Sequence, residues 1–371
     1  MAAQTADVAV VGGGIVGCSA AYFLAREGHN VMLFEKDSVA SHASGFAFGV
    51  LLPPIMEDPQ DPEADLNRVS FALHRELAES LPAESGIDVD LQRKAALVLA
   101  LDAAEAVGLR STYSAVKNSS RDIRWLSHGE LSHIEARIAP DIPGGLYLGD
   151  TYEVEPYKLT LALWQAAEKH GARLVNRAVD RVLVEHGRAI GVEARGEKHF
   201  AGAVVVASGP WSGALLDQSG VRVPVTPLKG QIIRLRVEGP PMRVSVWWRG
   251  DYASSKPDGL VWCGTTEEHE GFNEQPTPDA RDGITLSALR ALPYLETATL
   301  VKQTACLRPV TADGLPVLGV APGIEHLTIA TGAGRHGIAV GPGMGKAAAL
   351  LAMGAAPSFD TSRLSPARFS G

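Results

Sequence analysis

The chain of 371 residues is longer than one ordinary domain and predicts two or three domains. Its 34 lysines and arginines against 42 aspartates and glutamates give a net charge of −8, the wrong sign for a surface that follows phosphates, so we expect no nucleic-acid partner. A hydrophobic content of 46% and 39 glycines exclude a disordered chain and indicate a folded core with many tight turns.

The cysteines and the apolar runs bear on the cellular compartment. Cys18, Cys263 and Cys306 are odd in number and far apart, so they offer neither a disulfide framework nor a zinc-binding pair. This favours a reducing compartment and a cytoplasmic location, and we predict no metal site. The apolar runs at residues 8–24 and 327–351 are interrupted by glycines or by charges, so we expect no signal peptide and no membrane span.

The first predicted unit lies within residues 8–35. A β-branched strand, a glycine-rich turn, a helix with apolar residues at helical spacing and a second strand follow one another, and Gly28 ends the helix. This order is typical of a βαβ unit. A loop rich in serine, glycine and proline at residues 38–62 then leads into an amphipathic helix with leucines from Leu66 to Leu81 on one face.

The middle of the chain predicts mainly short strands. A helix at residues 156–170 ends at Gly171, and the strands after it predict a β-meander. Lys229 and Gln231 follow a proline and are expected only to turn the chain. A second, antiparallel sheet with one helix comes next, before a strand, a glycine loop and a helix beginning near Gly341 close the chain. The strands after residue 171 are predicted at residues 174–176, 179–186, 190–194, 203–207, 231–237, 244–248 and 260–263, and the helix at residues 284–292.

The glycine-rich turn has the spacing of a dinucleotide-binding loop. Gly12 allows the tight turn, Gly14 lets the backbone approach a pyrophosphate, and Gly17 allows close packing of helix on sheet. Glu35 ends the second strand, where a carboxylate can accept hydrogen bonds from a ribose. An adenine dinucleotide is therefore predicted, and both FAD and NAD remain open at this point.

Seven segments in order resemble the D-amino-acid oxidase family of flavoenzymes, in its glycine oxidase and sarcosine oxidase branch. The resemblance runs nearly end to end and is carried by residues 11–17, 34–35, 43–49, 206–212, 227–231, 307–314 and 332–338. It implies an α/β fold of the glutathione-reductase type, similar to p-hydroxybenzoate hydroxylase. A Rossmann-like FAD-binding domain would comprise residues 1–85, 145–222 and 300–371, and an antiparallel-sheet substrate domain would comprise residues 86–144 and 223–299.

The resemblance also implies which residues contact FAD. The loop at residues 332–337 would meet the flavin pyrimidine, and the helix after it would direct its positive end at charge on the reduced flavin. We expect FAD to be bound without a covalent link, although Cys306 stands where sarcosine oxidases hold their flavin-linking cysteine. The implied FAD contacts are Gly12, Gly14, Ile15, Val16, Gly17, Glu35, Lys36, Ala43, Ser44, Phe48, Gly49, Val50, Val179, Gly334, Arg335, His336, Gly337 and Ile338.

By the same resemblance, the reaction is oxidation of the C–N bond of a small amino acid or N-substituted amino acid. Hydride would pass from Cα to flavin N5, giving an imine and then a keto acid. Arg308 and Arg335 would hold the substrate carboxylate, and Tyr252 would orient it. The alternatives are an ion pair for Arg308, a solvent-facing charge for Arg335 and a strand-packing role for Tyr252.

Two departures from the family pattern concern the substrate. Phe48 replaces a small residue beside the flavin, and Glu267 stands where an apolar residue is common and is expected to cap a turn. The oxygen-activating lysine of sarcosine oxidases has no counterpart, so O2 and another electron acceptor both stay open, as does homo-oligomer formation. The remaining alternatives are a 2-hydroxy-acid dehydrogenase, a flavin-binding subunit that needs a partner, and an NAD enzyme.

Overall fold

The first strand of the chain is the centre of a parallel sheet. In the computed structural model, which describes residues 5–53 and 60–370, β1 (Thr5–Val11) pairs with β2 (Val31–Glu35) and with β12 (Glu197–Val206). β9 (Arg173–Asn176) extends the sheet in parallel beyond β2, and β19 (Leu327–Thr331) extends it beyond β12. The antiparallel β18 (Val317–Val320) follows β19. These strands come from separate parts of the chain, which confirms the Rossmann-like sheet.

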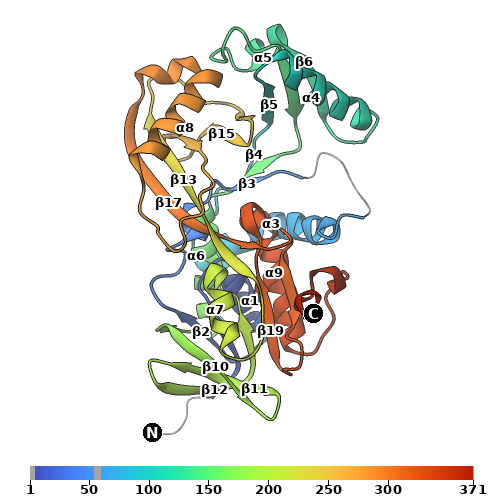
Figure 1. Cartoon of the computed structure of the whole chain (residues 1–371), viewed down its shortest axis with the longest axis vertical. Coiled ribbons are helices and arrows are strands. Elements are labelled where there is room, and N and C mark those ends of the chain that lie inside the picture. Colours follow the sequence, from blue (N-terminus) through green and yellow to red (C-terminus); the bar gives the residue numbers. More distant parts are fainter. Residues whose placement is uncertain (1–4, 54–59, 371) are drawn as a thin grey trace.

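The two faces of this sheet are covered by different elements. Alternate residues of β1 point to opposite faces, so Val8 and Val10 pack into one core, and Ala9 and Val11 into another. The first core is formed with four helices (Figure 1): α1 (Ile15–Arg26), α3 (Ala64–Ser85), α6 (Pro156–Lys169) and α9 (Gly337–Ala352). The second core is formed with β10 (Val179–Glu185), β11 (Arg188–Ala194) and α7 (Ser212–Asp217).

Helices α1 and α9 approach each other closely because α9 carries glycines on the shared face. A Cβ on Gly345 would lie 2.4 Å from Ser19 Cβ, and one on Gly341 would lie 2.7 Å from a methyl carbon of Ile15. Any larger residue would separate the two helices. This contact brings the start of α1 beside the start of α9, although the two lie more than 300 residues apart in the sequence.

A second sheet forms the upper half of the molecule in Figure 1. Its neighbouring strands are antiparallel, except that β14 and β5 are parallel. The order is β17 (Thr299–Thr311), β13 (Val225–Arg236), β16 (Val261–Gly264), β15 (Asp251–Ser255), β14 (Ser245–Trp248), β5 (Ala96–Ala100), β7 (Gly144–Leu148) and β6 (Ile123–Ser127). Its helices are α4 (Ala103–Val116), α5 (His128–Ile134) and α8 (Pro278–Ala291).

Two features connect the halves. The long strands β13 and β17 pair from Val225–Thr311 to Arg236–Thr299 and run from the upper half into the lower half (Figure 1). A small sheet lies at the junction, with the order β3 (Val50–Leu51), β8 (Tyr152–Glu153) and β4 (Gln92–Arg93). The remaining short elements are α2 (Ala43–Phe46), η1 (Gly209–Trp211), η2 (Pro293–Thr297), η3 (Gly334–His336), η4 (Ser362–Leu364) and η5 (Pro366–Phe369).

Several local predictions were wrong. β9 pairs in parallel with β2 instead of joining the meander, which consists of β10, β11 and β12. β13 begins at Val225, so Lys229 and Gln231 lie inside a strand and do not turn the chain. α9 begins at Gly337 and not near Gly341. The predicted domain limits stay a prediction.

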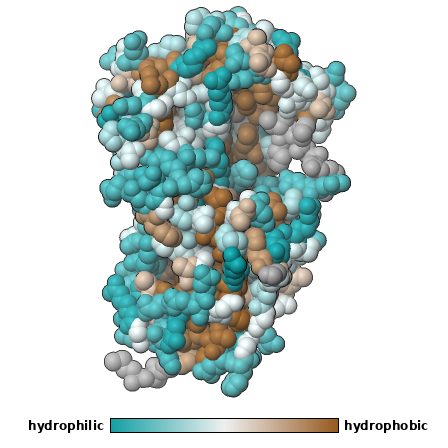
Figure 2. Space-filling model, viewed as in Figure 1, coloured by the Kyte–Doolittle hydropathy of each residue, from teal (hydrophilic) through white to brown (hydrophobic). Residues whose placement is uncertain are grey.

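The surface and the helices bear on the membrane prediction. On the face drawn in Figure 2, hydrophilic residues predominate and hydrophobic residues form separate patches. Within residues 5–53 and 60–370, no helix is both long enough and apolar enough to cross a bilayer.

Candidate functional site

A cavity of about 580 Å³ lies where the glycine turn, β17 and the loop before α9 meet. This volume is within the range of cavities that bind cofactors. Its lining includes every predicted FAD and substrate residue except Gly17. Gly17 instead lies behind the turn, where an added Cβ would be 1.9 Å from the carbonyl oxygen of Gly12. Gly17 is therefore required for the close packing that the sequence predicted.

One end of the cavity is built around the Glu35 carboxylate. The backbone N–H of Gly13 donates to Glu35 Oε2 (2.7 Å), and that of Asp37 donates to Oε1 (2.9 Å). The carboxylate thereby joins the glycine turn to the end of β2. An ionised carboxylate can accept further hydrogen bonds, so Glu35 remains able to bind a hydroxyl.

The N-terminus of α1 faces the same cavity. Ser44 Oγ accepts a hydrogen bond from the N–H of Ile15 (2.9 Å) and so caps the helix from a separate segment. Gly12 has φ of 110°, and a Cβ there would lie 2.4 Å from the carbonyl oxygen of Ala207. This bare backbone at a helix N-terminus is a general anion-binding arrangement and fits the pyrophosphate of a dinucleotide.

The loop at residues 332–338 closes the cavity from the side of α9. Because α9 begins at Gly337, its positive end lies in this loop, one turn earlier than predicted. His74 on α3 supports the loop from behind, since its Nε2 lies 3.0 Å from the carbonyl oxygen of Ile338 and 3.1 Å from that of Ala339. Burial lowers the pKa of His74 to about 4, which keeps this imidazole neutral near pH 7.

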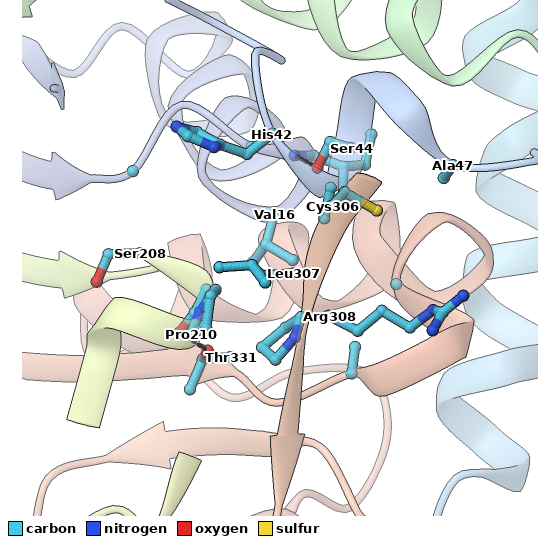
Figure 3. A pocket seen from close by; sticks show the side chains of 18 of the residues that line it. Val16, His42, Ser44, Ala47, Ser208, Pro210, Cys306, Leu307, Arg308 and Thr331 are labelled. Carbon is cyan, nitrogen blue, oxygen red and sulfur yellow. Dashed lines mark hydrogen bonds between the residues drawn. The ribbon is translucent and has the colours of Figure 1, made fainter. Parts of the chain in front are cut away.

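Arg308 points into the cavity from β17. Figure 3 shows its side chain leaving the strand on the side opposite Leu307. Nη1 donates to the carbonyl oxygen of Thr266 (3.0 Å), and Nη2 donates to Thr265 Oγ1 (2.7 Å). A Cβ on Gly230 would lie 2.3 Å from Nη2, so the guanidinium passes directly over this glycine. The alternative of an ion pair is not what the structure shows, because both acceptors are neutral.

An aromatic wall, defined as Phe48, Trp247 and Tyr252, lies beside Arg308. The rings of Phe48 and Tyr252 stack with centroids 3.9 Å apart, and Trp247 lies 5.7 Å and 5.0 Å from them. Burial raises the pKa of the Tyr252 phenol above its ordinary value, more than the Arg308 charge lowers it. The hydroxyl therefore stays protonated and can donate a hydrogen bond.

Arg335 lies at the rim of the cavity and is exposed. Its Nη1 contacts Glu267 Oε1 (3.1 Å), and its Nη2 donates to the carbonyl oxygen of Gly250 (2.7 Å). Arg335 is thus not a free surface charge, because Glu267 and Gly250 both hold its guanidinium. Glu267 was expected to cap a turn, and it pairs with this arginine instead.

Cys306 was the other residue that the resemblance singled out. Cys306 lines the cavity as a free thiol two residues before Arg308 (Figure 3), and burial raises the pKa of that thiol. Burial disfavours the thiolate, the nucleophilic form of cysteine.

Sequence reasoning missed two groups near the site. Lys229 and Gln231 are fully buried on β13, where Gln231 donates to the Glu268 carboxylate and the Lys229 ammonium lies 3.7 Å from it. The family motif at residues 227–231 was the signal that could have found them. Trp211 lines the cavity with the Lys36 ammonium 3.8 Å from its ring centre and the His42 ring 4.8 Å away. His42 also contacts Asp37 and Glu274, which joins the nucleotide end of the cavity to the loop after β16.

Comparison with known proteins agrees with this geometry. A family model described as "FAD dependent oxidoreductase" matches residues 7–351. The chain is 31% identical to the glycine oxidase of Geobacillus kaustophilus over 98% of its length and 97% of that protein. It is 30% identical to the glycine oxidase of Pseudomonas putida over 97% of its length and 98% of that protein.

Solved structures show the same fold. The glycine oxidase of Geobacillus kaustophilus superposes with a TM-score of 0.94 at 31% identity, over 99% of this chain and 100% of that one. An iminodiacetate oxidase from a Chelativorans species superposes with a TM-score of 0.89 at 28% identity, over 97% and 98% of the two chains.

Proposed function

The chain belongs to the family of FAD-dependent oxidoreductases, and from this premise we propose that it oxidises the C–N bond of a small amino acid or an N-substituted amino acid. The observation that carries the proposal is the Arg308 guanidinium, which lines the cavity beside a protonated phenol and an aromatic wall. A planar guanidinium suits a carboxylate because two parallel hydrogen bonds can form. The amino acid would therefore bind through its carboxylate at this end.

FAD supplies the acceptor for the hydride that leaves Cα. The protein then has to bind and orient the substrate, since a correct approach geometry lowers the barrier without any further chemical group. Arg308 would hold the carboxylate, and the Tyr252 hydroxyl would donate a second hydrogen bond to it. The aromatic wall would exclude water from the reacting carbon. Arg335 would add positive charge at the rim, where it is paired with Glu267.

The residues proposed to hold FAD are those of the glycine turn, the Glu35 end, the segment at residues 43–50 and the loop at residues 332–338. They fit the cofactor because the cavity offers bare backbone at the N-terminus of α1 for the pyrophosphate. The cavity also contains the charged side chains of Arg308 and Arg335. We propose in addition that the enzyme is cytoplasmic and that the electron acceptor is O2 or another oxidant. Size-exclusion chromatography with light scattering would test homo-oligomer formation.

The test is an absorption spectrum of the purified chain, followed by anaerobic reduction with a panel of substrates. We expect flavin bands that acid precipitation releases into the supernatant and that an amino acid bleaches. The panel should contain glycine, sarcosine, D-amino acids, proline and 2-hydroxy acids. Bleaching by 2-hydroxy acids alone would replace the proposal with a dehydrogenase, and failure of every substrate with the single chain would favour a subunit that needs a partner.

A further inference from the structure

We call Arg308 and its two acceptors, Thr265 and Thr266, the Arg308 clamp. Glu268 lies at the centre of a hydrogen-bonded group on the far side of this clamp. Its Oε1 and Oε2 accept from Gln231 Nε2 at 2.9 Å and 3.2 Å, and Oε1 also accepts from the hydroxyl of Thr266. The hydroxyl oxygen of Thr266 in turn accepts from the backbone N–H of Gln231 (3.0 Å). The position of Thr266 is therefore fixed by β13 through Glu268 and Gln231.

Thr266 is also the residue that holds the clamp. Its carbonyl oxygen accepts from Arg308 Nη1, and the preceding Thr265 accepts from Nη2. A shift of residues 265–266 would rotate both acceptors of the guanidinium together. The orientation in which Arg308 faces the carboxylate of a substrate thus depends on Glu268. The Glu268 carboxylate does not itself line the cavity.

Lys229 supplies the charge that balances Glu268. Its side chain is fully buried, and Nζ lies 3.7 Å from Glu268 Oε2. Among the residues that the structure describes, this ammonium has no hydrogen-bond partner, so the ion pair is its one compensation. Glu268 is less buried, with a quarter of its side chain exposed. Removing the acid should therefore disturb the protein more than removing the base, because a buried ammonium without a partner is costly.

We propose that Glu268, paired with Lys229, is a positioning residue that sets the orientation of the Arg308 guanidinium through Thr266. This inference rests on the proposed carboxylate-binding role of Arg308. The ion pair between the buried Lys229 and the partly exposed Glu268 would then control the affinity for carboxylate without touching the substrate.

The test is the affinity of the FAD-loaded enzyme for acetate. This affinity is measured from the shift of the flavin absorption bands during a titration with acetate. Four variants and one control are compared: Arg308→Met, Glu268→Gln, Lys229→Met, the Lys229→Met/Glu268→Gln double variant, and Glu270→Gln. Glu270 is an exposed acid in the same loop, so its variant makes the same change of charge without altering the group around Thr266.

We expect Glu268→Gln to weaken acetate binding more than tenfold and to raise KM for the amino acid more than it lowers kcat. Lys229→Met should have a smaller effect, and the double variant should recover most of the affinity, because neither charge is then left unpaired. Glu270→Gln should bind acetate as the unmodified enzyme does. A merely structural role would lower the melting temperature of the Glu268 variant and leave the acetate affinity unchanged.

Two results separate this inference from the function on which it rests. If Arg308→Met binds acetate normally, the clamp is wrong and the positioning role is wrong with it. If Arg308→Met loses acetate while Glu268→Gln binds it normally, the carboxylate-binding role of Arg308 stands and only the positioning role of Glu268 is overturned. Should Glu268→Gln fail to fold, Thr266→Val against Thr266→Ser repeats the test, because serine keeps the hydroxyl.

Discussion

The ammonium of Lys256 lies 4.4 Å from the centre of the Phe48 ring. Tyr252 also stacks on Phe48, with the two ring centres 3.9 Å apart. Lys256 is itself paired with the buried Glu153, at 3.0 Å between Nζ and Oε2. Phe48 therefore contacts both a phenol ring and a cation, and these contacts fix the wall of the cavity beside the proposed substrate.

Shortening Phe48 should change the substrate preference. Phe48→Leu and Phe48→Ala would open space beside Tyr252, and we expect kcat/KM to rise for amino acids with larger side chains or N-substituents relative to glycine. Phe48→Ala should also lower the free energy of unfolding by about 3 kcal/mol, as for other large-to-small changes in a core. The measurement is kcat/KM over the substrate panel, and an unaltered order of substrates in both variants would place Phe48 outside the substrate pocket.

Filling the glycine turn should remove the cofactor. A Cβ on Gly14 would lie 3.1 Å from Ser44 Oγ, so Gly14→Val would displace the cap on α1 and fill the backbone approach to the pyrophosphate. We expect a folded protein without flavin absorbance. Gly108→Ala is the matched control, because a Cβ there meets no atom within 4 Å and alanine favours the α4 helix by about 1 kcal/mol. Normal flavin content in Gly14→Val would contradict the proposed binding loop.

Cys306→Ser should retain FAD. Burial raises the pKa of the Cys306 thiol, so the thiolate needed for a covalent link is disfavoured. We expect the flavin of the unmodified enzyme to appear in the supernatant after acid precipitation, and the serine variant to behave in the same way. Yellow colour that stays in the pellet of the unmodified enzyme and leaves it in Cys306→Ser would establish Cys306 as a covalent anchor.

His74 should make the stability depend on pH. Burial lowers its pKa from 6.5 to about 4, so the unfolded chain binds a proton that the folded chain excludes in this interval. Its contribution to stability is complete above pH 6.5 and is lost as the pH falls towards 4, by about 3 kcal/mol. His74→Gln should show a smaller loss in urea unfolding between pH 7 and pH 4.5. Equal losses in both proteins would contradict the lowered pKa.

The sequence predicted the parts of the site that depend on local spacing. Gly12 lies in a turn and Gly17 in the first turn of α1, so their geometry is set within a few residues. The structure gives Gly17 the packing role that its spacing indicated. The family motifs likewise placed Arg308 and Tyr252, which the structure brings to one cavity.

The rest depends on pairings between distant segments. Arg335 and Glu267 are 68 residues apart in the sequence, and Gln231 and Glu268 are 37 apart. Neither contact follows from a local sequence pattern. In the sequence, Lys229 is only a polar residue shortly after a proline. The pairing of β13 with β17 buries its side chain, and this pairing does not follow from the local sequence.

The bonds that the Glu35 carboxylate makes with the N–H groups of Gly13 and Asp37 have a consequence for cofactor exchange. Because these contacts are made within the protein itself, the entropy lost in ordering the turn belongs to the folding of the chain and is not subtracted from cofactor affinity. The apoprotein should consequently present a rigid receptor, and reconstitution should be limited by diffusion of FAD into the cavity and not by a slow rearrangement of the loop.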